Sequence, residues 1–565
     1  MTSASGRQKP PRVGNKLEHP ALAACVGAAV AAIATLPGLG SGTLWDNSET
    51  AYGEVAREIL ITHDWAVMHF NTVPYFVQPP LYFWLAAAFS LLFGLSSFAL
   101  RLPSALATIA LAAATGYAVA RQAGTRVGIY ASLILSSCLM VAVIGRLAIM
   151  DALLDLAVAL AIFWWFRGLE TGRDRYVVYG WIAVALGFLA KGPVAPVAAL
   201  MVAIPFYFWN ARCEKTYPPS ARAWLLGLSA FAVIVVPWPL ILVSRFRLFP
   251  LQELFGYYTF GRYTGIIENQ SGPLWYYLPV LLLGFFPWIA FFPMAVAYGI
   301  RLLRGATSDP GLARLVRLSV CWIVVPLLFF SFARTKLPNY VALEFPALAL
   351  VVAIYFEAVV RRGGTRSAVV SASFVPIGIG MLAIAIAIFL ERNRLDVTAA
   401  HLLPGVIAMG AAIFAGSLLT ALLLTRRPTA GAAPYALVCA ALIAIDVLAV
   451  AILPLTDAYK PIPRLAAIVD RDRRPFDVVA IQSISGGNAL LFYTRPDVAV
   501  LAPARDGGRE DHGIDPRVAI CGARRAWVIA PKRRPSYDPT YGRRRTLVAT
   551  DLNAALFLYD GPPCS

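Results

Sequence analysis

Charged side chains are scarce in this sequence. Asp, Glu, Lys and Arg make up 14% of its 565 residues, whereas soluble domains carry about 25%. Hydrophobic residues make up 59%, and mean hydropathy is +0.67. This shortage of charge, together with long apolar runs, excludes an ordinary soluble protein and indicates a chain that lies mostly in a bilayer. Its few polar side chains at membrane depth are therefore the first candidates for function.

Histidine and cysteine are also few, with five and seven residues. No spacing of the histidines suits a metal, and no Ser-His-Asp arrangement is evident, so the sequence predicts no metal and no cofactor. A P-loop and a strand followed by G-x-G-x-x-G are both missing, which argues against nucleotide binding. The net charge of +18 lies in short clusters between apolar runs. We read those clusters as topology signals and expect no nucleic-acid partner.

The apolar runs predict about thirteen membrane-spanning helices. The first covers about residues 21–39 and follows a basic segment without acids. Twelve more centre near residues 110, 135, 160, 183, 201, 233, 286, 323, 349, 379, 413 and 444. The basic clusters between them all fall on the cytoplasmic side if the N-terminus is cytoplasmic and the apolar stretch 80–98 does not cross. The sequence thus predicts a multi-pass plasma-membrane protein whose C-terminus lies outside.

We expect residues 1–455 to form the membrane domain, with a long outer loop at 41–100, and residues 456–565 to form an outer domain. The outer segment contains short β-type runs at 477–481, 498–501, 526–529 and 555–559, which predict a small soluble α/β fold. Cys521 and Cys564 both fall in it. An oxidising compartment permits a disulfide between them, and two unrelated free thiols are the alternative.

The first outer loop concentrates acid, with five carboxylates against one base, Arg57. Asp46 and Glu49 fit a capping box, with Asp46 at the N-cap and Glu49 at the third helical position, opening a helix to about residue 60. They also fit a site in which one carboxylate acts as general base or orients an acceptor hydroxyl. Glu54 and Glu58 lie one helical turn apart, and we expect them to form a solvated face.

Further candidates lie at predicted outer helix ends. Asp151 begins a spanning helix, which indicates either a functional group at membrane depth or an acid that stabilises a helix N-terminus, and Asp155 lies one turn deeper. Lys191 and Lys336 are external cations beside glycine and proline, against the positive-inside tendency. They suit an anionic lipid phosphate, and snorkelling at a helix end is the alternative.

Several motifs follow one another in an order typical of one family. They are Trp45-Asp-Asn-Ser-Glu-Thr-Ala-Tyr52, Tyr75-Phe-Val-Gln-Pro-Pro-Leu-Tyr-Phe-Trp84, Ala99-Leu-Arg-Leu-Pro-Ser104, Leu189-Ala-Lys-Gly-Pro193, Pro273-Leu-Trp-Tyr-Tyr-Leu-Pro279 and Thr335-Lys-Leu-Pro-Asn-Tyr340. Over about residues 20–360 the sequence resembles the aminoarabinose transferase and protein O-mannosyltransferase family of integral-membrane glycosyltransferases. The resemblance implies the glycosyltransferase C fold, with an all-α polytopic membrane domain and a C-terminal periplasmic α/β domain.

The resemblance also implies an activity. Such enzymes move a sugar, with inversion, from a polyprenyl phosphate, usually undecaprenyl phosphate in bacteria, to an acceptor outside the cytoplasm. Here the acceptor would be lipid A, another glycolipid, a polysaccharide or a protein. The resemblance also implies that the protein lies in the bacterial inner membrane, in contact with membrane lipids, and that its active site faces the periplasm. The alternatives are a transporter or flippase, or a non-catalytic binder of a polyprenyl-linked lipid.

This sequence departs from the family motifs at several positions, two of which bear on the predicted site. The acidic pair of the first loop is Ser48-Glu49, with Asp46 two positions earlier, so either Asp46 replaces the missing aspartate or the acceptor is activated differently. The lysine before Pro-Pro is Gln78. The predicted catalytic residues are Asp46, Glu49 and Asp151. The donor phosphate is predicted to bind Lys336, Arg334, Lys191 and Arg146. The sugar or the acceptor is predicted to bind Arg57, Tyr75, Gln78, Tyr82 and Tyr340.

Overall fold

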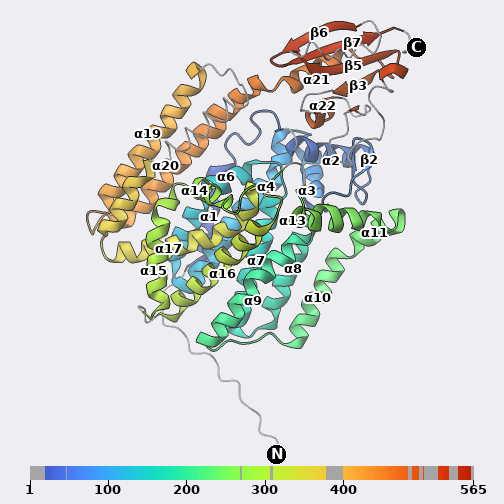
Figure 1. Cartoon of the computed structure of the whole chain (residues 1–565). Coiled ribbons are helices and arrows are strands. Elements are labelled where there is room, and N and C mark those ends of the chain that lie inside the picture. The colour runs from blue at the N-terminus through green and yellow to red at the C-terminus, as the bar shows by residue number, and fades with distance from the viewer. Residues whose placement is uncertain are drawn as a thin grey trace, which may run out of the picture.

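The computed structural model describes residues 19–45, 48–266, 270–305, 309–376, 399–481, 487–494, 500–501, 520–532 and 545–561. Most of these residues form helices that pack together in a bundle, and a small β-sheet lies at one end of it (Figure 1). A helical membrane region followed by a C-terminal α/β part was predicted, and the fold confirms it.

In the described part of the chain, seven helical stretches are long and apolar enough to span a membrane. They are α4 (Ser97–Ala123), α7 (Asp151–Thr171), α9 (Val194–Cys213), α16 (Pro310–Phe332), η3 with α17 (Pro338–Glu344 and Phe345–Arg361), α19 (Ala399–Leu423), and the run η4, α20, η5 and η6 (Ala430–Ala432, Ala433–Val447, Leu448–Ile452 and Leu453–Tyr459). Each coincides with a predicted apolar run.

Three pairs of helices pass the same criteria together but are bent. They are α5 (Thr125–Ser136) with α6 (Leu139–Arg146), bent by 62°, α10 (Ala221–Val235) with α11 (Pro237–Phe246), bent by 44°, and α14 (Tyr277–Gly284) with η2 and α15 (Trp288–Phe291 and Phe292–Leu303), bent by 105°. The first predicted run and the run near residue 183 correspond to α1 (Pro20–Thr35) and α8 (Asp174–Lys191). The run near residue 379 lies largely outside the described residues, so the total of thirteen stays a prediction.

The first outer loop folds into α2 (Glu49–Thr62), a hairpin of β1 (His69–Phe70) and β2 (Val73–Pro74), and α3 (Leu81–Phe93). With 13 residues, α3 is about 20 Å long, which is shorter than a hydrocarbon core of about 30 Å. Its length therefore fits the assumption that residues 80–98 do not cross. The segment between α11 and α14, which separates the predicted runs near residues 233 and 286, is largely helical, with α12 (Phe249–Leu251), η1 (Gln252–Gly261) and α13 (Arg262–Thr264).

The C-terminal part begins with α21 (Pro461–Asp472) and builds a five-stranded sheet in the order β4-β3-β5-β7-β6. Its strands are β3 (Val478–Ile481), β4 (Val500–Leu501), β5 (Arg525–Pro531), β6 (Arg545–Asp551) and β7 (Ala554–Asp560). The pairs formed by β3 are parallel, and those formed by β7 are antiparallel. Helix α22 (Gly487–Tyr493) packs against α2 and so joins this part to the first loop (Figure 1).

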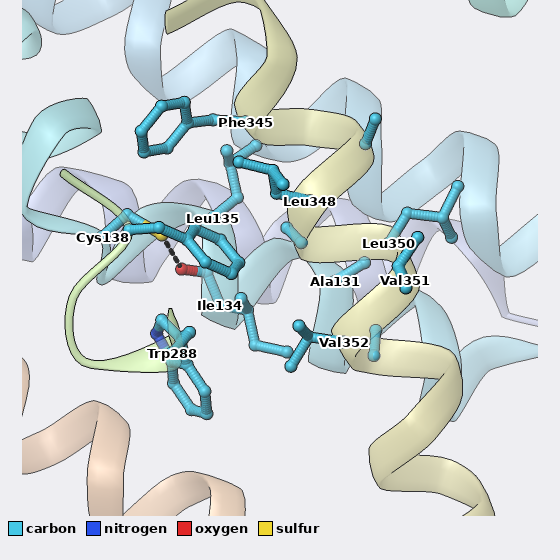
Figure 2. Close-up of a cluster of buried hydrophobic side chains, with 14 of the residues drawn as sticks. Ala131, Ile134, Leu135, Cys138, Trp288, Phe345, Leu348, Leu350, Val351 and Val352 are labelled. Carbon is cyan, nitrogen blue, oxygen red and sulfur yellow. Dashed lines mark hydrogen bonds between the residues drawn. The ribbon is translucent and has the colours of Figure 1, made fainter. Parts of the chain in front are cut away.

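The core of the bundle surrounds α17, whose residues from Phe345 to Phe356 are all buried. Figure 2 shows Phe345, Leu348 and Val352 of this helix facing Ala131, Ile134 and Leu135 of α5. Close approach of α4 and α5 depends on small residues: a Cβ on Gly128 would lie 2.5 Å from the carbonyl oxygen of Gly116. Small residues at such contacts are what tight packing of membrane helices requires.

Candidate functional site

The first-loop carboxylate Glu49 is completely buried. Its Oε1 accepts a 2.8 Å hydrogen bond from Arg101 Nε, and its Oε2 accepts one of 2.8 Å from Arg101 Nη2. The two side chains thus form a bidentate ion pair. Oε1 also accepts from the amide of Ala148 at 2.7 Å, and Oε2 from the amide of Trp45 at 2.9 Å. Four donors thus occupy both oxygens, and Glu49 ties the first loop to α4 and to the turn before α7.

The predicted capping arrangement is wrong in its register. Helix α2 begins at Glu49 with Ser48 as N-cap, and the Ser48 side chain makes no capping hydrogen bond. Glu49 is therefore the first helical residue and not the third, and its carboxylate bonds backward to Trp45 because Arg101 draws it toward α4. Asp46, the other predicted member of the box, lies outside the described residues.

Glu54 and Glu58 were expected on a solvated face, and that expectation is wrong. Both are buried, with 1% and 6% of their surface exposed. Glu58 accepts a 2.9 Å bond from the amide of Thr72 in the hairpin turn, and Glu54 pairs with Arg57 at 2.7 Å. Burial raises the pKa of Glu54 to about 8, although Arg57 acts in the opposite direction.

Arg57, predicted to bind sugar or acceptor, contacts the C-terminal part. Its guanidinium is buried and donates to three backbone carbonyls at the end of α22: Leu491 at 3.1 Å, Phe492 at 3.1 Å and Thr494 at 2.6 Å. A cation at a helix C-terminus satisfies carbonyls that lack helical partners and meets the negative end of the helix dipole. The structure therefore places Arg57 at the junction between α2 and α22.

A second group of polar side chains gathers where α7 begins, α8 ends and α16 connects to α17. Oδ1 of Asp151 accepts from Lys191 Nζ at 2.5 Å and from Asn339 Nδ2 at 2.6 Å. The Lys191 ammonium also lies 5.6 Å from the ring centroid of Tyr340. Gly192 ends α8 with a φ of 66°, a conformation that favours glycine, so Lys191 is the last residue of its helix.

These contacts show how sequence-distant motifs converge. Asp151 is buried and Lys191 is largely so, and within the described residues the second carboxylate oxygen of Asp151 has no hydrogen-bond partner. Asp155 is also buried one turn deeper in α7, and the described residues give it no hydrogen bond or ion pair. Asp151, Asp155 and Lys191 thus form a cluster of two carboxylates and one lysine. Asn339, which sequence reasoning left out, completes it.

Lys336 lies three residues before Asn339 and is also buried, with 5% of its surface exposed. Its ammonium donates to the carbonyl of Ala333. No carboxylate of the described residues lies within ion-pair distance of it, and burial lowers its pKa. The backbone around it is held by hydrogen bonds from the Arg334, Thr335 and Lys336 amides to the carbonyls of residues 263, 262 and 270. Arg334 itself is exposed.

Arg146, the fourth predicted phosphate ligand, has other partners. Its Nε donates to the carbonyl of Ala34 at 2.9 Å, and its Nη1 to that of Pro37 at 2.6 Å. Its Nη2 pairs with Asp446 of α20 at 2.9 Å. These bonds join the end of α1 to α6 and α20, so Arg146 acts in the structure as a link between helices.

The predicted aromatic residues are packed in the first loop. Tyr82 is completely buried, and its hydroxyl donates to the carbonyl of Leu100 at 2.9 Å. Tyr75 is buried against Phe70 and Phe83. Gln78 is half-buried. Of the predicted sugar or acceptor residues, Tyr340 is the one that the structure brings to Asp151 and Lys191.

The predicted disulfide is described at one of its two cysteines. Cys521 is disulfide-bonded, whereas Cys25, Cys138, Cys213, Cys321 and Cys439 are free thiols. Cys564 lies outside the described residues, so its pairing with Cys521 stays a prediction.

Comparison with known proteins gives this arrangement a context. The family described as dolichyl-phosphate-mannose-protein mannosyltransferase matches residues 77–238. Undecaprenyl phosphate-alpha-4-amino-4-deoxy-L-arabinose arabinosyl transferase 2 of Proteus mirabilis is 30% identical over 328 residues, or 56% of either chain. The transferase for the same sugar from Pseudomonas aeruginosa is 30% identical over 363 residues, or 62% of either chain. The chain thus spans about three fifths of the length of these curated relatives.

Among solved structures, the crystal structure of ArnT from Cupriavidus metallidurans bound to undecaprenyl phosphate has a TM-score of 0.71. The match covers 95% of this chain and 97% of that chain, at 20% sequence identity, and the apo state of the same protein gives the same values. Because the match covers nearly all of this chain, the structural similarity includes the C-terminal part.

The chain is accordingly a multi-pass membrane protein with the glycosyltransferase C fold. The relatives to which it is similar are aminoarabinose transferases, the family that its motifs resemble.

Proposed function

We propose that the protein is a membrane glycosyltransferase that moves a sugar, with inversion, from undecaprenyl phosphate or a related polyprenyl phosphate to an envelope acceptor. The observation that carries the proposal is Lys336, a buried lysine without a carboxylate partner in the described part of the chain, next to the Asp151 cluster. An unpaired buried cation is costly unless an anion meets it. A lipid phosphate suits that role, because the relatives from Proteus mirabilis and Pseudomonas aeruginosa are both named as transferases that use undecaprenyl phosphate-linked sugar.

In the proposed reaction, Lys336 binds the donor phosphate, with Arg334 at the exposed side. The bond between the anomeric carbon and the phosphate oxygen breaks, and the polyprenyl phosphate leaves with an additional negative charge. A cation already in place stabilises that charge as it develops, which lowers the barrier more than it strengthens substrate binding. Lys191 contributes more weakly because Asp151 neutralises it.

The acceptor oxygen attacks the opposite face of the anomeric carbon, and its proton passes to a carboxylate. We assign that role to Asp46 or to the free oxygen of Asp151, which Lys191 and Asn339 hold in one orientation through its other oxygen. If the acceptor is a phosphate, it is already anionic and needs no base. Tyr340 then offers a ring and a hydroxyl for the sugar.

Four predicted site residues receive other roles in this proposal. Glu49, Arg57, Arg146 and Tyr82 each make hydrogen bonds within the protein, and we infer that they hold the first loop and its neighbours in place. Tyr75 and Gln78 remain candidates for the acceptor side.

We further infer that the Asp151 cluster and residues 456–565 face the periplasm of a bacterial inner membrane, with residues 1–455 as the membrane domain. The positions of the basic clusters support this orientation. The acceptor in this proposal is lipid A or another glycolipid, a polysaccharide or a protein.

The test is sugar transfer by the full chain in detergent. Purified protein is incubated with undecaprenyl-phosphate-linked sugars and an envelope lipid extract, and products are identified by mass spectrometry. We expect transfer by the unaltered protein, and a loss of about 100- to 1,000-fold in Lys336→Ala, comparable to the loss of an oxyanion donor. Lys532→Ala, at an exposed lysine directly after β5, is the control and should stay active. Full activity of Lys336→Ala would overturn the phosphate role.

A transporter or flippase is the second candidate, and it is distinguished by the same assay. In detergent there are no two compartments, so a transporter would produce no new covalent product. Such a result for correctly folded protein, with every donor tried, would count against the transferase.

A further inference from the structure

Residues 43–45 precede the first-loop acids Asp46 and Glu49 in the sequence. They are bound by the chain segment at the end of the last membrane helix. Asp457 Oδ2 accepts from the amide of Thr43 at 2.7 Å, and its Oδ1 accepts from the Thr43 hydroxyl at 2.8 Å. The next residue, Leu44, donates its amide to the hydroxyl of Tyr493 at 2.8 Å. These contacts join parts of the chain more than 400 residues apart.

Lys460 completes this contact, which we call the loop clamp (Thr43, Trp45, Asp457 and Lys460). Its ammonium pairs with Asp457 at 2.9 Å and donates to the carbonyl and hydroxyl of Thr43 at 3.1 and 3.2 Å. It also lies 4.2 Å from the ring centroid of Trp45. Such a distance is well within the range of a cation–π contact. Lys460 therefore binds the backbone, a hydroxyl and an aromatic ring of one short segment.

The first-loop residues of the loop clamp directly precede Asp46 in the sequence. Trp45 immediately precedes Asp46, and the amide of Trp45 donates to Glu49. Glu49 is in turn fixed by Arg101 and by the amide of Ala148, three residues before Asp151. Trp45 and Glu49, which flank Asp46 in the sequence, are thus both held, Trp45 by the C-terminal segment and Glu49 by the membrane helices.

We propose that Asp457 and Lys460 are positioning residues for sugar transfer, acting through Trp45 on the first-loop carboxylates that follow it in the sequence. This inference rests on the proposed function, in which a first-loop carboxylate serves the acceptor. It gives the C-terminal segment a part in the reaction that docking alone would not require. Since the proposed function gives the first-loop carboxylate to the acceptor and Lys336 to the donor, loss of the clamp should reduce turnover while donor binding by Lys336 persists.

The experiment compares full-length variants in detergent in the transfer assay, with kcat and the KM for donor determined separately. We expect Lys460→Met to lower kcat about 10- to 100-fold, as small misplacements of reacting groups do, with the donor KM within about threefold of the original. Lys460→Arg keeps the charge and the cation–π contact, and should recover most of kcat. Lys532→Met is the control outside the clamp.

A milder variant covers the case in which Lys460→Met does not fold. Thr43→Val removes the hydroxyl that bonds to Asp457 and Lys460 but leaves both charges and the shape of the side chain. We expect a fall in kcat of about three- to tenfold for it. An unchanged kcat in Thr43→Val or Lys460→Met, or no recovery in Lys460→Arg, would overturn the positioning role. If the unaltered protein itself transfers no sugar, the proposed function fails first, which is a separate result.

Discussion

Two buried acid–base clusters of this protein contrast in how far their hydrogen-bonding capacity is used. In the Glu49–Arg101 cluster, four donors occupy the carboxylate, and the guanidinium bonds to backbone carbonyls as well. In the Asp151–Lys191 cluster, one oxygen takes both donors, and nearby Lys336 has a carbonyl as its described partner. Burial alone therefore does not identify a reactive carboxylate or lysine. The two clusters differ in unused hydrogen-bonding capacity beside a buried charge, and that difference directs our proposal to the second cluster.

The largest effect is expected from breaking the closed cluster. Arg101→Leu leaves Glu49 as a buried, uncompensated carboxylate, and removing one partner of such a pair costs about 3–5 kcal/mol. We expect a strong loss of folded protein, measured by thermal unfolding in detergent and by the yield of monodisperse material. Lys532→Leu, at an exposed lysine, should behave like the unaltered protein. A stable Arg101→Leu protein would show that the cluster does not hold the first loop.

A smaller loss, in activity and not in folding, is expected for the open cluster. Asp151→Asn removes the charge that pairs with Lys191 but keeps an oxygen for Asn339. We expect transfer per folded molecule to fall about 100-fold, within the range for a lost general base. The thermal midpoint should change less than in Arg101→Leu. The opposite order, with stability lost and activity per folded molecule retained, would make Asp151 a structural acid like Glu49.

The smallest effect is expected at Glu54, and it appears as a dependence on pH. The pKa of Glu54 rises from 4.5 to about 8 in the folded chain, so between these values the folded state binds more protons than the unfolded state. Stability should therefore fall as the pH rises from about 4.5 to 8 and level off above 8. Glu54→Gln, which keeps an acceptor for Arg57, should remove that slope. Thermal midpoints of both proteins between pH 5 and 9 provide the check, and parallel curves would contradict the assignment.

How many of the site residues could be predicted from the sequence depends on where the partner of each residue lies in the chain. Asp151, Lys191 and Lys336 could be selected from the sequence because an ion at an outer helix end is unusual in itself. Asn339 and Arg101 were not selected, because their acidic partners lie 188 and 52 residues away. No local pattern records such a pairing.

The first loop likewise shows that the sequence does not predict which surfaces are buried by distant parts of the chain. Helical spacing placed Glu54 and Glu58 on one face correctly, but it does not say what covers that face. The cover comes from the hairpin turn at Thr72 and from α22, to which Arg57 bonds across 435 residues. The fold class was predictable because hydropathy and short β-type runs are local signals. Strand β6 was missed because it lies at the sheet edge, where its residues are largely exposed.

The central claim is that Lys336 is the cation that receives the donor phosphate. Its most direct test is the affinity of purified protein for undecaprenyl phosphate, measured for the unaltered chain, Lys336→Ala and the control Lys532→Ala. A charged hydrogen bond contributes about 1.5–3 kcal/mol, so we predict an affinity about 10- to 100-fold weaker for Lys336→Ala, with an unchanged thermal midpoint. Equal affinity of Lys336→Ala and the unaltered protein would contradict the account.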